Sequence, residues 1–115
     1  MKPHKNECSY SLFSRNTLIN GKIKSDFDSI RFEGKMKGEI ISCKKIITAA
    51  SAEIIGNLKG KSIVHNGLLE GTIKSEELYL KENSITNGEV VSKIISIENA
   101  IFNGDLIIST KEDQY

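Results

Sequence analysis

The sequence predicts an all-β chain folded as a β-helix, in which one short unit is repeated about six times along a common axis. Three observations predict this fold. Glycines recur at a nearly constant spacing, an aliphatic residue stands two positions after each, and a small residue follows two positions later in five repeats. Self-similarity at a near-fixed period is the signature of a repeat architecture. The glycines, spaced 17, 18, 15, 17 and 16 residues apart, are Gly21, Gly38, Gly56, Gly71, Gly88 and Gly104.

Each repeat contains three short apolar stretches that are too short for helices and rich in isoleucine and valine. Alternation over a few such residues is typical of strands. Three strands with polar corners describe one triangular winding. A single winding cannot bury its inward side chains, so stacked neighbours must complete the core. Because stacked strands lie about 4.8 Å apart, six windings would form a rod roughly 25–30 Å long.

The corners of the predicted windings carry Asn-Gly pairs, which suit left-handed backbone conformations at tight bends. The one proline of the chain, Pro3, precedes the repeats, where it removes no hydrogen bond between strands. A β-sandwich of ordinary short strands is the alternative, but a sandwich does not require glycines in phase. The pairs are Asn20-Gly21, Asn66-Gly67, Asn87-Gly88 and Asn103-Gly104.

The 115 residues are expected to form one domain between two tails. Residues 1–14 are polar and lack the repeat, so we expect a flexible N-terminal tail there. The β-helix domain is expected over residues 15–109 and a C-terminal tail over residues 110–115. Within the first tail, Ser9 to Phe13 is mildly apolar. It is expected to cap the first winding rather than to touch a membrane, because Tyr10, Leu12 and Phe13 alternate as in a strand.

Composition excludes several classes of function. Lysine and arginine total 16 against 15 acidic residues, whereas dedicated nucleic-acid binders usually carry a clear basic excess. No apolar run approaches the ~20 residues that span a bilayer. The N-terminus has no hydrophobic signal core, so the expected location is the cytoplasm. Cys8 and Cys43 are 35 positions apart and form no metal-binding pair, so we interpret them as reduced thiols.

One stretch resembles a phosphate-binding loop. Residues Gly56 to Ser62 read Gly-Asn-Leu-Lys-Gly-Lys-Ser, with Lys61 in the position of the phosphate-binding lysine. The loop needs four residues between its glycines, a strand before it and a helix after it. Here only three residues separate the glycines and no helical pattern follows Ser62. We therefore expect no nucleotide, and no other cofactor or metal.

An enzyme is the alternative function class, specifically a left-handed β-helical acyltransferase with His65 as its base. His65 is the one histidine outside the N-terminal tail. Such enzymes keep a strict six-residue aliphatic period, hence about 18 residues per coil, and the observed spacings do not keep it. His65 beside Asn66-Gly67 is more simply an exposed corner residue. A carbohydrate-binding β-helix is a third alternative, weakened by the scarcity of outward aromatic residues. We therefore predict no catalytic residues.

Two surface features of the predicted β-helix bear on partners. Three residues after each glycine comes an outward position that is basic at first and apolar later. Solvated lysines are the simplest explanation, and a lateral or membrane contact is the alternative. The open strands at the ends of a β-helix invite pairing, and no helix or charged cap covers Leu106 to Ile108. That end is therefore a predicted assembly surface. The outward positions are Lys24, Ile41, Lys59, Lys74, Val91 and Ile107.

With the repeats aligned, the sequence resembles the bactofilins, a bacterial family of polymer-forming β-helical cytoskeletal proteins. Asn16 to Ser25, Asn-Thr-Leu-Ile-Asn-Gly-Lys-Ile-Lys-Ser, is similar to the family's first winding. Leu78 to Leu106, with Asn-Gly-Glu-Val-Val-Ser and Ile-Ser-Ile-Glu-Asn-Ala-Ile-Phe-Asn-Gly, resembles its last windings. The resemblance covers roughly residues 15–109. It implies a right-handed, three-faced parallel β-helix between disordered tails.

The resemblance also implies a function: a cytoskeletal scaffold that assembles end to end into non-polar filaments without nucleotide or metal. Such filaments organise cell shape or cell-wall synthesis, often at the inner face of the cytoplasmic membrane. The implied partners are other copies of the chain and cell-wall remodelling or membrane proteins. The sequence does not start with the short hydrophobic peptide that often binds membranes in the family, so we do not expect direct membrane binding. The expected polymerisation interface is apolar and lies in the terminal windings: Phe102, which matches a phenylalanine of the family, with Leu106, Ile107, Ile108, Leu18 and Ile19.

Overall fold

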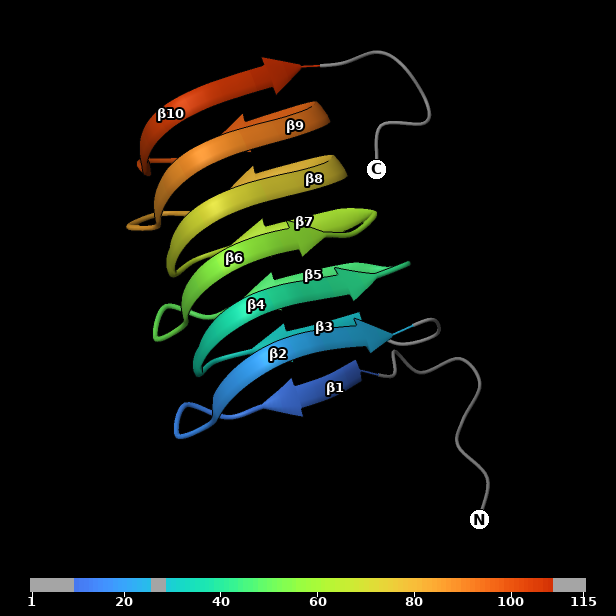
Figure 1. The fold of residues 1–115 in the computed structure, drawn as a ribbon. Coiled ribbons are helices and arrows are strands. Elements are labelled where there is room, and N and C mark those ends of the chain that lie inside the picture. Colours follow the sequence, from blue (N-terminus) through green and yellow to red (C-terminus); the bar gives the residue numbers. More distant parts are fainter. Residues whose placement is uncertain (1–9, 26–28, 109–115) are drawn as a thin grey trace.

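The computed structural model describes residues 10–25 and 29–108, and every regular element in these two ranges is a β-strand (Figure 1). The ten strands pair in parallel within one sheet that winds around an axis, from β1 at one end to β10 at the other. The predicted all-β solenoid of about six windings is confirmed. The strands are β1 (Tyr10–Phe13), β2 (Leu18–Ser25), β3 (Ser29–Phe32), β4 (Lys35–Ser42), β5 (Lys45–Thr48), β6 (Glu53–Lys59), β7 (Ser62–His65), β8 (Leu68–Leu80), β9 (Ile85–Ile97) and β10 (Ile101–Ile108).

Each winding consists of a long strand, bent at its glycine, and a short strand. The long strands stack in the order β2, β4, β6, β8, β9, β10, and the short strands in the order β1, β3, β5, β7. The second halves of β8 and β9 continue the short ladder, because these two strands run on around the corner. Two of the three predicted strands per winding are therefore one strand bent in the middle.

The glycine column forms the bend of the long strands. All six glycines pair with one another from winding to winding, and their φ angles lie between +137° and +146°. Residues that carry a side chain rarely adopt this backbone conformation. A Cβ atom on Gly71 would also overlap the carbonyl oxygen of Gly56 in the preceding winding. The bend therefore requires glycine for its backbone angles and for its close contact with the next strand.

The Asn66-Gly67 pair corrects one prediction. Gly67 does not have a positive φ, so the expected left-handed corner there is wrong. Glycine is needed for a different reason, since a Cβ atom would overlap the carbonyl oxygen of Ala52 one winding below. The non-glycine residues with positive φ in the described ranges are Asn83 and Asn99, at 70° and 50°. Both lie in the turns that precede long strands, where asparagine tolerates this conformation better than most residues.

Inward side chains form columns because the strands pair in register. An aliphatic residue in one winding is covered by its counterparts in the windings above and below, which removes it from water. In the terminal windings one of these two neighbours is missing, and this property defines the site described below. The columns include Ile30, Ile46, Ile63 and Leu78; Met36, Ile54 and Leu69; and Ile40, Leu58, Ile73 and Val90, all buried.

Strand β1 lies within the range that the sequence predicts to be a flexible tail. It pairs with β3, and the Phe13 ring packs against the Phe32 ring with the centroids 5.8 Å apart. The solenoid therefore begins before the expected boundary at residue 15. Residues 1–9, which include Cys8, and residues 109–115, which include the expected C-terminal tail, lie outside the described residues. In the two described ranges, no helix is long and apolar enough to cross a bilayer.

Candidate functional site: the two open ends of the solenoid

The N-terminal end of the solenoid is formed by two strands that each pair on one side only. Among the described residues, β2 pairs with β4 and β1 pairs with β3, so their outer edges have no strand beside them. Backbone N–H and C=O groups on such edges are free to pair with another chain. Leu18 and Ile19 begin β2 and alternate. Leu18 points outward and is 72 % exposed, whereas Ile19 is half-buried and packs against the core.

The C-terminal end is formed by β10, which pairs with β9 alone in the described part of the chain. Val90 and Leu106 occupy the same inward column one winding apart, yet Val90 is 0 % exposed and Leu106 is 36 % exposed. The difference arises because no winding covers Leu106. Ile108 is 62 % exposed for the same reason. Phe102 stacks over Thr86 and is half-buried against the core.

The structure thus divides the predicted interface residues into two groups at opposite ends. Leu18 and Ile19 lie on the edge of β2, and the other four lie on β10 (Figure 1). Ile107 points outward on the side of the rod, whereas its neighbours Leu106 and Ile108 point inward. No described residue brings the two groups together. They can act in one contact only if a second copy of the chain supplies the other end.

His65 is buried, so the prediction of an exposed corner position is wrong. It ends β7 with an exposed fraction of 0 %. Its Nδ1 lies 2.6 Å from the Thr48 hydroxyl, and its Nε2 lies 3.3 Å from the Ile85 carbonyl oxygen. A carbonyl only accepts hydrogen bonds, so Nε2 carries the proton and Nδ1 accepts from Thr48. The Asn66 N–H donates in turn to the Thr48 hydroxyl, which completes the network.

This environment makes His65 a structural residue. Burial lowers its pKa from 6.5 to about 4, partly offset by hydrogen bonds to the backbone at Ile85 and Gly67. Burial disfavours the charged form of a histidine. An acyltransferase base must reach a substrate in solution. Both ring nitrogens of His65 are engaged inside the rod, so its geometry does not provide such a base.

The loop that resembles a phosphate site is part of two strands. Gly56 to Lys59 lie in β6, and Ser62 begins β7. The prediction that no helix follows Ser62 is confirmed. A phosphate loop binds through backbone amides at the start of a helix, and here the Lys61 and Ser62 amides donate instead to the Lys44 carbonyl.

The buried serines of the next column are structural as well. Ser75 donates to the Ser92 hydroxyl at 3.3 Å, and Ser92 lies 3.1 Å from the carbonyl oxygens of Glu76 and Ile94. A nucleophilic serine needs an adjacent base, and the groups around Ser92 are another hydroxyl and carbonyls. Within the described residues, no group of three His, Cys, Asp or Glu side chains could hold a metal ion.

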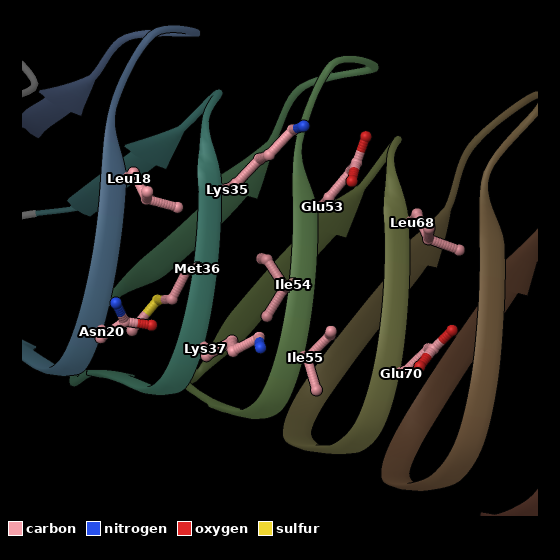
Figure 2. A pocket seen from close by; sticks show the side chains of 10 residues that line it. All are labelled: Leu18, Asn20, Lys35, Met36, Lys37, Glu53, Ile54, Ile55, Leu68 and Glu70. Carbon is pink, nitrogen blue, oxygen red and sulfur yellow. The ribbon is translucent and has the colours of Figure 1, made fainter.

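A hollow of about 450 Å³ on the side of the rod was not predicted from the sequence (Figure 2). It lies across the first halves of β2, β4, β6 and β8, and outward side chains of both charges surround it (Figure 2). The exposed Ile55 stands between Lys37 and Glu70 in the same outward column. Alternation alone would have placed these residues outward, but the depth of the hollow depends on side-chain packing that a sequence pattern does not specify.

The described residues therefore form a parallel β-solenoid in which the strands at each end pair on one side only. The chain belongs to the bactofilin family, whose model, described as polymer-forming cytoskeletal, matches residues 11–107. The predicted family resemblance is therefore confirmed. The first matched residue lies in β1, which agrees with the early start of the solenoid.

Solved structures and curated proteins give two further matches. The solid-state NMR structure of the cytoskeletal bactofilin BacA superposes with a TM-score of 0.79 at 19 % identity, covering 89 % of this chain and 98 % of that one. At this identity the match shows the fold. Basic membrane protein C of Borreliella burgdorferi, in strains N40 and ATCC 35210, is 34 % identical over 70 residues. The aligned part is 59 % of this chain and 19 % of that protein, so the chain spans about a fifth of those relatives.

Proposed function

We propose that the chain is a cytoskeletal scaffold that assembles end to end into filaments, through the open edges of β2 and β10 and without nucleotide or metal. The observation that carries the proposal is the difference in exposure between Leu106 and Val90. The two residues are equivalent in the repeat, and one more winding would bury Leu106 as it buries Val90. A second copy of the chain offers the same kind of edge.

The proposed interface contains Phe102, Leu106, Ile107 and Ile108 at one end and Leu18 and Ile19 at the other. The proposal also includes features that come from the family resemblance. The winding is right-handed, and the filaments are non-polar, which means that like ends meet. The protein lies in the cytoplasm, at the inner face of the membrane, and has a role in cell shape or cell-wall synthesis. Cell-wall remodelling or membrane proteins are the proposed clients.

The test is Phe102→Arg. Phe102 lies in the last described strand, where its ring completes the stack over Thr86. Arginine would place a charge in a surface that must become dry on association, and an unpaired buried charge costs about 3–5 kcal/mol. We expect the variant to keep its β circular dichroism spectrum and to remain in the supernatant after ultracentrifugation, whereas the parent protein sediments as filaments.

The matched control is Ile55→Arg. Ile55 is another exposed apolar residue, but it lies on the side of the rod, away from both ends (Figure 2). The Ile55→Arg variant should form filaments like the parent protein. Normal filaments from Phe102→Arg would remove this residue from the interface. Loss of the β spectrum would make it a core residue, and a monodisperse parent protein at all salt and protein concentrations would contradict the proposed function itself.

A further inference from the structure

Six lysines gather at one corner of the rod, where the long strands end and the short strands begin. Lys59 and Lys74 are direct partners in adjacent strands, and Lys24 lies in the same outward column two windings below Lys59. The Lys61 amide donates to the Lys44 carbonyl at 3.0 Å, so these two turn residues are also stacked. We name this set, in which all members are exposed, the basic corner: Lys24, Lys44, Lys45, Lys59, Lys61 and Lys74.

The charges of the basic corner have no acidic partner among the described residues. The ion pairs of the described ranges use other cations, namely Lys22, Arg31 and Lys81. Like charges on directly opposed residues of adjacent strands, such as Lys59 and Lys74, are destabilising. The whole chain has a net charge of only +1, so the positive charge is concentrated here and balanced elsewhere. Such separation orients a protein toward an anionic surface.

A hollow of about 270 Å³ opens between the lysines. Lys59 and Lys61 flank it, and Ile41 and Ser42 contribute to its walls. Gly60 also lines the hollow, in the position where the neighbouring repeats carry serine. The residues that line the hollow thus include the apolar Ile41 and two lysines, each with an apolar stem and a charged end. Such side chains prefer a boundary between an apolar layer and water.

The chemistry of the basic corner favours a broad anionic surface over a specific anionic group. All six cations are lysines, which act as point charges, whereas arginine provides the fork that binds a single phosphate or carboxylate in two places. The lysines extend over three winding steps, roughly 14 Å at strand spacing, along a straight outer edge. Glu76 and Glu77, in the same winding as Lys74, stack on Lys61 and limit the patch at that end. A row of lysines along one edge can lie on a flat surface, and its hollow of about 270 Å³ is too small to enclose a peptide.

We propose that the basic corner docks the protein on a bilayer that contains anionic phospholipids, with headgroup phosphates among the lysines. This contact is built into the folded rod and requires no hydrophobic N-terminal peptide. Basic residues near an anionic leaflet contribute additively to binding and lose their effect as salt rises. The proposal does not depend on filament formation, because a single rod carries the complete corner.

The test uses the full chain and vesicles of phosphatidylcholine with or without about 30 % phosphatidylglycerol, an anionic fraction that creates a negative surface potential. Flotation on a density gradient measures the bound fraction. We expect the parent protein to float with the anionic vesicles at low salt, to be released at high salt and to ignore the neutral vesicles. Lys59→Glu with Lys61→Glu should reduce the partition coefficient by a factor of about ten or more.

The matched control is Lys35→Glu with Lys37→Glu, which makes the same change in net charge on another side of the rod (Figure 2). It should stay within about twofold of the parent protein, because screening limits distant charges. Circular dichroism checks each fold, and the milder Lys59→Gln with Lys61→Gln replaces the glutamate variant if that one is unfolded. Lysines of residues 1–9 are the same in all variants, so they do not affect the comparison.

Three results would overturn the proposal. Equal losses in the basic-corner and control variants would show that net charge alone governs binding. Binding that is absent from anionic vesicles, or equal on neutral ones, would remove the bilayer as the partner. Binding to soluble poly-glutamate, lost in the basic-corner variant and without any flotation, would assign the corner to an acidic protein segment instead.

Discussion

His65 shows how one polar residue fits inside an aliphatic rod. The column that it shares contains Phe32, Thr48 and Leu80. A histidine is accepted there because the Thr48 hydroxyl, directly below it, donates a hydrogen bond to Nδ1, and the Ile85 carbonyl oxygen accepts one from Nε2–H. The hydrogen bonds of both side chains are therefore made within the core. A buried polar group costs little free energy when its hydrogen bonds are made.

The lowered pKa of His65 predicts a pH dependence of stability. The unfolded chain, with a histidine pKa of 6.5, binds the proton more readily than the folded chain, with a pKa of about 4. Stability is therefore complete above pH 6.5 and falls as the pH drops toward 4. The loss amounts to about 3 kcal/mol. Urea unfolding between pH 7 and pH 4 measures it.

The control for this prediction is the double variant His65→Leu with Thr48→Val. It removes the titrating group together with its partner hydroxyl, so neither side is left with an unsatisfied hydrogen bond. Carboxylates titrate in both proteins and cancel in the difference. We expect the double variant to lose less stability over this pH range, by the same ~3 kcal/mol. Parallel curves would mean that His65 is protonated in the folded state near its ordinary pKa.

Two glycines with the same backbone conformation allow the cost of backbone strain to be measured apart from the cost of steric overlap. Gly71 and Gly21 have φ angles of +146° and +142°. A Cβ atom on Gly71 meets the carbonyl oxygen of Gly56, whereas no atom lies within 4 Å of a Cβ atom on Gly21. Gly21→Ala should cost about 1–2 kcal/mol of backbone strain. Gly71→Ala should cost at least about 2 kcal/mol more, because backbone must move apart. Urea unfolding tests the order, and equal costs would contradict the close contact.

At the scale of the element, β1 decides where the solenoid begins. Phe13 packs against the core and contacts Phe32, whereas Leu12 points outward and is 55 % exposed. Phe13→Ala should therefore lower the free energy of unfolding by about 2 kcal/mol, less than for a fully buried phenylalanine. Leu12→Ala, its neighbour in the same strand, should change it by less than about 0.5 kcal/mol. Equal small effects, measured by urea unfolding, would show that β1 is not part of the stable fold.

The elements that the sequence predicted well are those that repeat. The glycine column could be identified because a bent strand in close contact with its neighbour admits no other residue, and its period gave the stack of windings. The inward positions of β7 were harder to predict, and the expected exposed position of His65 is wrong. The parallel register pairs Ile63 with Ile46 and His65 with Thr48. The adjacent Asn66-Gly67 pair suggested a corner, but glycine is required at position 67 by close contacts with the carbonyl oxygens of Ala52 and Ala49.

The candidate site was predicted as a set of residues, and its geometry was not. The apolar residues Leu106 to Ile108 were predicted to form an assembly surface at the end of the repeats. The sequence does not show how far each side chain is covered, because coverage depends on the winding above it. The basic corner is a similar case. Its lysines come from four separate stretches of the sequence, and only the register places Lys59 beside Lys74 and stacks the turn residues Lys44 and Lys61.

At the scale of the whole molecule, the solenoid is a stack of nearly equivalent windings, and among the described residues each end winding has a neighbour on one side only. Stability in such a stack is close to a sum over neighbouring windings. A substitution at an end therefore lowers the free energy of unfolding by less than one in the middle. Its effect on a contact with another copy is not reduced in this way. This separation makes the end residues suitable for testing the proposed assembly.

Gly21→Ala tests the N-terminal end in this way. In the glycine column each Cβ atom would point toward the strand on the N-terminal side, as the overlap between Gly38 and Gly21 shows. At Gly21 that direction leads out of the molecule, into the space that a second copy would occupy if its strand paired with β2. The added methyl group should leave the rod folded and keep another backbone from approaching at strand spacing, which is about 4.8 Å.

We expect Gly21→Ala to stop assembly at dimers, joined through the C-terminal end that the substitution leaves intact. Non-polar filaments contain contacts between like ends, so blocking one end leaves one contact per molecule, and an isologous contact closes at two copies. In a polar filament the same substitution would leave monomers, because each contact would use one end of each kind. Sedimentation velocity distinguishes dimers from monomers. Filaments of normal length would exclude the β2 edge from the interface, and combining Gly21→Ala with Phe102→Arg should reduce the dimers to monomers.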